Sequence, residues 1–210
     1  MEGRKLQLLK EWCPLDMTAQ KIKESREANG GKIVLKGILQ RADTLNQNGR
    51  VYPKPILERE IRNYQKFIRE RRSLGEADHP DTSVIELKNV SHIVTEATMS
   101  GDTVHGVVEL LDTPSGKILQ SLVESGITLG ISSRGVGSTH REGDHVVVQD
   151  DFQLICFDIV SEPSTSSAFL VRESAREITA QEIKTTFTRS DRIDRLMNDI
   201  IYRNNLIKQK

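Results

Sequence analysis

Two stretches rich in β-branched residues, residues 86–99 and 103–111, are separated by only three residues, Ser100-Gly101-Asp102. A connection this short is typical of a β-hairpin, because parallel strands need a crossover of about a dozen or more residues. Stretches of similar character occupy residues 32–41, 127–138 and 145–160. The chain is therefore predicted to build its core around mostly antiparallel strands.

Helices are predicted at two places between these strands. Residues 55–72 repeat aliphatic side chains near a helical period, with Pro55 suited to the first turn. Residues 113–125 begin with Thr113, which can cap a helix, and stop before Gly126, which can end one. The predicted fold class is therefore mixed α+β.

Changes in composition divide the chain into three parts. Residues 1–31 are polar and weakly patterned and are predicted to form an N-terminal arm, followed by an α+β body over residues 32–171. Residues 172–210 are predicted as a C-terminal helical tail, because residues 190–207 repeat apolar side chains on one helical face. This helix could dock on the body, bind a scaffold protein, mediate assembly or complete the core.

The composition argues against several classes of function. Lys plus Arg and Asp plus Glu number 30 each, so no net charge draws the chain to nucleic acid or a membrane. Only 4% of residues are aromatic, which argues against a base-stacking platform. Cys13 and Cys156 are too few for a disulfide scaffold or a cysteine-rich zinc site. No apolar run is long enough to span a bilayer. We expect a soluble cytosolic protein without metal or other cofactor.

His79 stands out among the five histidines because it follows the first predicted helix, in the sequence Gly75-Glu76-Ala77-Asp78-His79-Pro80. Pro80 favours an extended backbone at His79, and an imidazole is the side chain best suited to moving protons near neutral pH. His79 is therefore a candidate catalytic residue. The alternative is that Gly75 and Pro80 only end the helix and leave His79 exposed.

The second candidate is a glycine-rich segment, Gly130-Ile131-Ser132-Ser133-Arg134-Gly135-Val136-Gly137-Ser138. It has neither the Gly-Lys-Ser/Thr ending of a P-loop nor the glycine spacing of a dinucleotide site, which argues against phosphate binding. A hydrolytic serine fits better, because acyl transfer needs a nucleophile and nearby oxyanion donors. The alternative is a glycine-rich strand at a corner of a sheet.

Four motifs follow one another within about residues 33–168, namely Asn46-x-Asn48-x-Arg50-x-Tyr52-Pro53, Gly75-Glu76-x-x-His79-Pro80, Gly130-Ile131-Ser132-Ser133-Arg134-Gly135-x-Gly137-Ser138 and Asp158-x-Val160-x-x-Pro163-Ser164. Together they resemble the prohead core protease family of T-even-like tailed bacteriophages, which is distantly similar to the herpesvirus assembly protease. The resemblance implies a mostly antiparallel, β-barrel-like core with flanking helices. It also implies that residues 32–171 are a serine endopeptidase domain.

The resemblance assigns the two groups that exchange a proton. His79 matches the general base, and Ser132 matches the nucleophile, with Ser133 as the alternative. Because successive side chains of a strand point to opposite faces, only one of the two serines can meet His79. A histidine ordinarily titrates near pH ~6.5, so activity is expected to fall as the medium becomes more acidic.

The remaining roles are also implied by the resemblance. Asp158 matches an acidic third member that orients the imidazole, as in hydrolase triads. Glu76 and Asp78 are its rivals because both lie close to His79 in the sequence. Arg134 and Gly135 follow the serines and are expected to contribute to the oxyanion or substrate site.

The family is expected to cut after a glutamate that follows an aliphatic residue two positions earlier. Leu9-Lys10-Glu11 fits this pattern, so self-cleavage at the Glu11–Trp12 bond is expected. The implied substrates are phage scaffold, core and major capsid proteins, which places the enzyme in the prohead interior within the host cytoplasm, and self-association is expected. The alternatives are a non-catalytic capsid-associated or tube-like structural protein that shares the fold, and a catalytically silent scaffold-binding protein.

Overall fold

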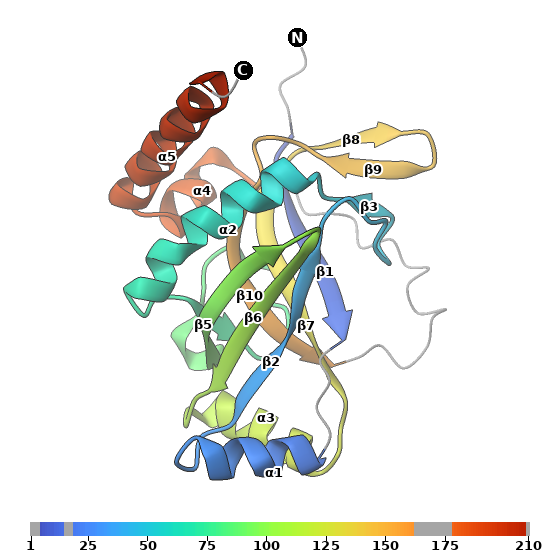
Figure 1. The fold of residues 1–210 in the computed structure, drawn as a ribbon, viewed down its shortest axis with the longest axis vertical. Helices are drawn as coiled ribbons and strands as arrows, with labels where there is room; N and C mark the ends of the chain where they lie inside the picture. Colours follow the sequence, from blue (N-terminus) through green and yellow to red (C-terminus); the bar gives the residue numbers. More distant parts are fainter. Residues whose placement is uncertain (1–4, 15–18, 162–177, 209–210) are drawn as a thin grey trace.

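Three β-sheets and five α-helices make up the part of the chain that the structure describes (Figure 1). The structure is a computed structural model, and it describes residues 5–14, 19–161 and 178–208. The strands are β1 (Gln7–Pro14), β2 (Val34–Arg41), β3 (Arg50–Val51), β4 (Leu74–Glu76), β5 (Val90–Ser100), β6 (Thr103–Leu110), β7 (Leu129–Gly137), β8 (Thr139–Glu142), β9 (His145–Val148) and β10 (Gln153–Ser161). The helices are α1 (Ala19–Ala28), α2 (Lys54–Arg69), α3 (Pro114–Glu124), α4 (Ala180–Thr186) and α5 (Arg189–Lys208), with a 3-10 turn η1 (Leu87–Asn89).

The sheets have the strand orders β1-β7-β10, β2-β6-β5-β4 and β3-β9-β8. All pairs are antiparallel except β3 with β9. The predicted mixed α+β class with mostly antiparallel strands is therefore confirmed, and so is the hairpin of β5 and β6. The predicted barrel-like core is wrong for the described residues. The β1-β7-β10 sheet meets the β2-β6-β5-β4 sheet through one isolated bridge, Ala77 to Ile159, and not through a ladder that would close them.

The predicted helix ends are visible as specific contacts. The Thr113 side chain accepts a hydrogen bond from the backbone N–H of Gly116 at 3.0 Å, which caps the start of α3. Gly126 follows the helix with φ of +79°, a left-handed conformation that costs glycine little. Figure 1 shows α3 beside α1 at one end of the molecule, with the β8–β9 hairpin at the other.

The core lies between the sheets and beneath α2. Leu57 and Tyr64 on α2 are 0% and 1% exposed, and the Tyr64 ring meets the edge of Phe157 on β10 with ring centres 5.6 Å apart. Fully burying side chains of this size contributes about 1.5–3 kcal/mol each. This packing fixes α2, and hence the loop that leaves it, against the sheet of β7 and β10. None of the described helices is long and apolar enough to cross a membrane.

The first strand was not predicted from the sequence. Residues 7–14, inside the predicted N-terminal arm, form β1 and pair with β7 along their whole length, from Gln7 opposite Gly137 to Pro14 opposite Gly130. Leu9 is fully buried in the core. The arm therefore supplies one edge of the sheet that carries the glycine-rich segment.

Helix α5 packs on α2 through polar side chains. Arg195 Nη1 lies 2.6 Å from Glu60 Oε2, and Asn198 Nδ2 donates to Asn63 Oδ1 at 2.9 Å. The apolar side chains on the other face are 46–61% exposed, namely Ile193, Leu196, Met197, Ile200 and Ile201. The tail helix thus docks on the body, but through its polar face and not through the apolar face that the sequence pattern marked.

Candidate active site

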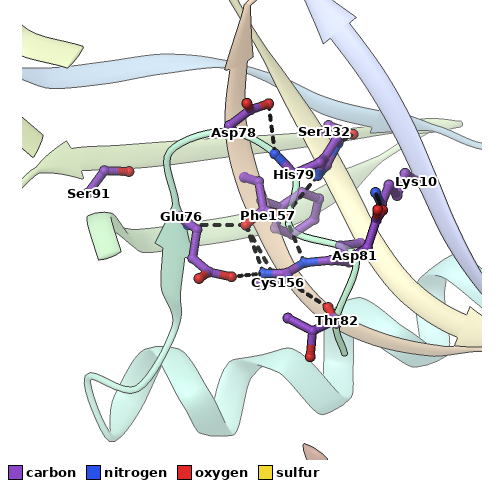
Figure 2. A network of polar contacts seen from close by, with 12 residues as sticks. Lys10, Glu76, Asp78, His79, Asp81, Thr82, Ser91, Ser132, Cys156 and Phe157 are labelled. Carbon is purple, nitrogen blue, oxygen red and sulfur yellow. Dashed lines mark hydrogen bonds and ion pairs between the residues drawn. The ribbon is translucent and has the colours of Figure 1, made fainter. Parts of the chain in front are cut away.

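Strand β7 separates the two adjacent serines onto opposite faces of its sheet, as strand geometry requires. Ser132 Oγ lies 2.5 Å from His79 Nε2, and Figure 2 shows the two side chains meeting. Ser133 pairs with Phe157 in the register, and among the described residues its buried Oγ has no hydrogen-bond partner. The geometry therefore brings Ser132, and not Ser133, to the histidine.

Asp158 reaches this site because of an irregularity in β10. Leu154 pairs with Gly135, but Cys156 pairs with Arg134, so the register shifts by one residue between them. Such bulges redirect the side chains that follow. After the shift, Asp158 stands directly opposite Ser132, on the same face of the sheet. Its Oδ2 lies 3.0 Å from His79 Nδ1, which completes a chain from serine to histidine to carboxylate.

The loop that carries His79 is held against β10 by its backbone. The Asp78 N–H donates to the Ile159 carbonyl at 2.8 Å, and Asp78 has a φ of +68°. The Asp78 carboxylate accepts the backbone N–H of His79 at 2.9 Å. The carboxylate of Asp78, one rival for the third position, therefore shapes the loop through the His79 backbone and not through the imidazole. The His79 side chain is 17% exposed, whereas Ser132 is 1% exposed.

Asp158 is a buried carboxylate surrounded by donors. Its Oδ1 accepts the backbone N–H of Glu76 at 3.1 Å and the Cys156 thiol at 3.3 Å, and Arg134 Nε lies 2.8 Å from Oδ2. Burial alone would raise the pKa of Asp158, but the hydrogen bond with His79 and the charge of Arg134 outweigh it. The pKa is therefore held below its usual value, and the group facing the imidazole is an anion.

Arg134 and Gly135, the residues expected at the oxyanion or substrate site, each have a structural role in the described chain. The Arg134 side chain is fully buried and donates to the Glu76 carboxylate and to the Thr82 carbonyl. Glu76, the second rival for the third position, is thus bound to Arg134. A Cβ on Gly135 would lie 2.4 Å from the Phe152 ring, so the absent side chain makes room for packing.

Gly75 of the second motif is explained by close packing. A Cβ there would lie 2.1 Å from the Phe157 carbonyl oxygen and 2.2 Å from His92 Nε2. His92 is itself fixed, because its Nε2 lies 2.8 Å from that carbonyl and burial lowers its pKa to about 4, which keeps the imidazole neutral. A backbone atom and a buried ring cannot both withdraw at low cost.

Gly75→Ala is therefore expected to lower the free energy of unfolding by about 1–3 kcal/mol or more. Chemical denaturation of the full chain, followed by circular dichroism, measures this change. An unfolding midpoint equal to that of the wild type would contradict the packing argument.

The side chains of the first motif bind β1 and do not contact Ser132, His79 or Asp158 through the hydrogen bonds described here. Asn48 Nδ2 and Arg50 Nη1 bind the Glu11 carboxylate at 3.0 and 2.8 Å, and the Tyr52 hydroxyl donates to it at 3.0 Å. Glu11 is only 3% exposed, and burial raises its pKa above the usual value despite these partners. The motif therefore anchors the edge strand next to β7.

Sequence reasoning missed Lys10, whose side chain contacts the loop that follows His79. Lys10 pairs with Arg134 in the register, and its Nζ lies 2.9 Å from Asp81 Oδ1 in the loop after His79. Figure 2 shows this pair close to His79 and Ser132. No pattern in the sequence indicates the contact, because it joins β1 to a loop about seventy residues away.

Pro163 and Ser164 of the fourth motif lie outside the described residues. Among the residues that the structure describes, no set of three His, Cys, Asp or Glu side chains is arranged to hold a metal ion.

A serine, a histidine and a buried acid joined in this order are typical of serine hydrolases, the class of enzyme that includes the serine proteases. Within that class, the chain belongs to the prohead core protein serine protease family, whose model matches residues 12–182. A prohead core protein protease of Enterobacteria phage T4 is 29% identical over 159 residues, which cover 73% of this chain and 75% of the phage protein.

A solved structure supports the fold. The capsid assembly protease of bacteriophage T4 aligns with a TM-score of 0.64 and 24% identity, over 75% of this chain and 99% of that chain. At this identity the likeness concerns the fold alone, which is the mixed α+β architecture described above.

Proposed function

We propose that the chain is the endopeptidase of phage prohead maturation and that Ser132, His79 and Asp158 are its catalytic residues. The observation that carries the proposal is the distance of 2.5 Å between Ser132 Oγ and His79 Nε2, two residues 53 positions apart in the sequence. The contact of His79 Nδ1 with Asp158 Oδ2 at 3.0 Å supports the same roles. A structural capsid or tube protein has no need of this arrangement.

In the mechanism, Ser132 Oγ attacks the carbonyl carbon of a peptide bond while its proton passes to His79 Nε2. Asp158 accepts a hydrogen bond from Nδ1–H and stabilises the imidazolium that forms. The tetrahedral intermediate collapses, the C–N bond breaks, and His79 gives its proton to the leaving amine. Water then attacks the acyl-enzyme with His79 as base, which releases the acid and restores Ser132.

The donors for the oxyanion remain a prediction at the backbone of Arg134 or Gly135. Strand β7 is paired with β1 on one side and β10 on the other at both residues. An N–H group of β7 would have to exchange its bond in the ladder for one to the oxyanion. Each such donor is typically worth about 2.7–4 kcal/mol in the transition state.

The substrates, location and specificity follow from the family as proposals. We propose scaffold, core and major capsid proteins as substrates, cleaved after glutamate inside the prohead, with self-association of the protease there. A distant similarity to the herpesvirus assembly protease is part of the same proposal. Self-cleavage at Glu11–Trp12 requires β1 to leave the sheet, because Glu11 is 3% exposed and bound to Arg50 and Tyr52.

Co-expression of the full chain with candidate scaffold and capsid proteins of the same phage tests the proposal. Mass spectrometry of the products is expected to find new C-termini at glutamate, including Glu11 if self-cleavage occurs. His79→Ala is expected to abolish these fragments, because the imidazole in contact with Ser132 Oγ is the proposed acceptor of its proton. His105→Ala is the matched control, since His105 is exposed on β6 and is expected to leave cleavage unchanged.

Two results would contradict the proposal. The first is the same set of fragments from His79→Ala as from the wild type, which would remove His79 from the mechanism. The second is a folded wild-type chain that cuts none of the capsid or scaffold proteins, which would favour a non-catalytic structural role.

A further inference from the structure

Behind the histidine, three ionisable side chains are completely buried together. Glu76, Arg134 and Asp158 are each 0% exposed. Arg134 Nη2 donates to the Glu76 carboxylate and lies 3.2 Å from Asp158 Oδ1, while Arg134 Nε lies 2.8 Å from Asp158 Oδ2. The guanidinium therefore bridges two carboxylates, of which only Asp158 contacts His79.

The arrangement has a defined charge. Two carboxylates and one guanidinium leave one net negative charge beside a neutral imidazole, and none once His79 has taken a proton. Without the guanidinium, two buried carboxylates this close would not both stay ionised, because like charges in a site of low polarity drive one of them to bind a proton. Arg134, together with the hydrogen bond from His79, thus allows Asp158 to be an anion there.

We propose that Arg134 and Glu76 are positioning residues of the protease: Arg134 keeps Asp158 ionised and aimed at His79, and Glu76 supplies the second negative charge that makes the cluster neutral when His79 is protonated. In this role the two side chains act through Asp158. The inference rests on the proposed roles of Ser132, His79 and Asp158.

The other groups around His79 do not provide this charge. From β7, Ser132 is neutral, and from β10, Cys156 donates its thiol proton to Asp158 Oδ1 at 3.3 Å. From β1, Lys10 is paired with Asp81 at 2.9 Å. Asp78 directs its carboxylate to the His79 backbone at 2.9 Å. The buried cluster is therefore the charge that faces the imidazole from within the protein.

The rate at which a fluorophosphonate labels Ser132 in the full chain, measured against pH, tests the proposal without a known substrate. Ser132 Oγ bonds to phosphorus, fluoride leaves, and the serine proton passes to His79. Glu76→Gln keeps the acceptor for Arg134 but removes a negative charge, so the imidazolium is less stable. The acidic limb of the rate profile is expected to move to lower pH by about 0.5–1 unit, with a lower plateau.

Arg134→Met is expected to move the same limb in the opposite direction, by about 1 unit or more to higher pH, because an extra proton is then held at Asp158 or His79. The double variant Glu76→Gln with Arg134→Met restores one net negative charge. Its limb is expected to return close to that of the wild type. A purely structural role predicts no such opposed shifts and no return.

Glu60→Gln is the matched control. Glu60 is another fully buried glutamate paired with an arginine, Arg195, but it lies on α2 and does not contact the triad. Its removal should leave the limb in place. If the acidic limbs of Glu76→Gln and Arg134→Met both coincide with that of the wild type, the inference is overturned. Labelling of the wild type at Ser132 would still support the proposed function.

If Arg134→Met does not fold, Glu76→Gln and the double variant decide the question by the same shifts. A wild-type chain that is not labelled at Ser132 at any pH would overturn the proposed function and this inference with it.

Discussion

Replacing Ser132 by alanine is expected to reduce kcat/KM for cleavage of a capsid or scaffold protein by about 10⁵–10⁶-fold. The reason is that Ser132 Oγ is the hydroxyl group that lies within hydrogen-bond distance of His79 Nε2 among the described residues, at 2.5 Å. Removing the nucleophile leaves only binding and electrostatic stabilisation of the substrate, which cannot form an acyl-enzyme. The measurement is the rate of appearance of the cleaved product, with purified full-length variants.

Ser133→Ala is the matched control, one residue away on the same strand. Its Oγ is buried on the face of Phe157, without a hydrogen-bond partner among the described residues. Loss of such a hydroxyl changes the free energy of unfolding by about 1 kcal/mol or less, and its sign can be favourable. Cleavage is expected to continue. The reverse result, with activity lost in Ser133→Ala and kept in Ser132→Ala, would show that the described register of β7 is wrong.

The sequence motifs contain the side chains that meet in the candidate site, but they do not indicate how these side chains are held. His79, Ser132 and Asp158 each lie in a separate motif, and the structure brings these three together. Alternation along a strand then separates Ser132 from Ser133, as expected from elementary geometry. Motif chemistry is local, so it can be recognised from a few neighbouring residues.

The register that makes the site could not be predicted. Without the irregularity between Leu154 and Cys156, Phe157 would stand opposite Ser132 and Asp158 would face the other side of the sheet. The two registers, with and without the irregularity, are compatible with the same composition and the same apolar periodicity of β10. Only long-range pairing, which no single-chain pattern records, distinguishes them.

The partners of two buried charged side chains could not be recognised from the sequence. Glu11 gives β1 the polar character of an exposed arm, although Arg50 and Tyr52 bind its carboxylate in the interior. The Arg134 side chain is buried between Glu76 and Asp158, and no sequence pattern indicated these partners, whereas the expected contribution of Arg134 to the oxyanion or substrate site stays a prediction. In each case the charged side chain finds its partner on a strand or loop distant in sequence, so hydropathy assigns it to the surface.

Asp158→Asn is expected to lower kcat by about 10³–10⁴-fold while the chain stays folded. The groups around Oδ1, which include the Glu76 N–H and the Cys156 thiol, are donors and favour the amide oxygen of asparagine there. The amide NH₂ must then point at His79 Nδ1. That bond selects the tautomer with hydrogen on Nε2, which cannot accept the Ser132 proton.

A second aspartate in the same region provides the control for this prediction. Asp151 Oδ1 accepts the backbone N–H of Ser138 at 2.8 Å, so Asp151→Asn also alters a carboxylate that binds a backbone amide. It lies away from His79 and should keep nearly full activity. Single-turnover kinetics with a cleavable capsid or scaffold protein measures the chemical step, and thermal unfolding checks that both variants fold. Activity of Asp158→Asn within tenfold of the wild type would mean that the carboxylate does not set the histidine tautomer, because a wrongly protonated imidazole has no route to accept the serine proton at that rate.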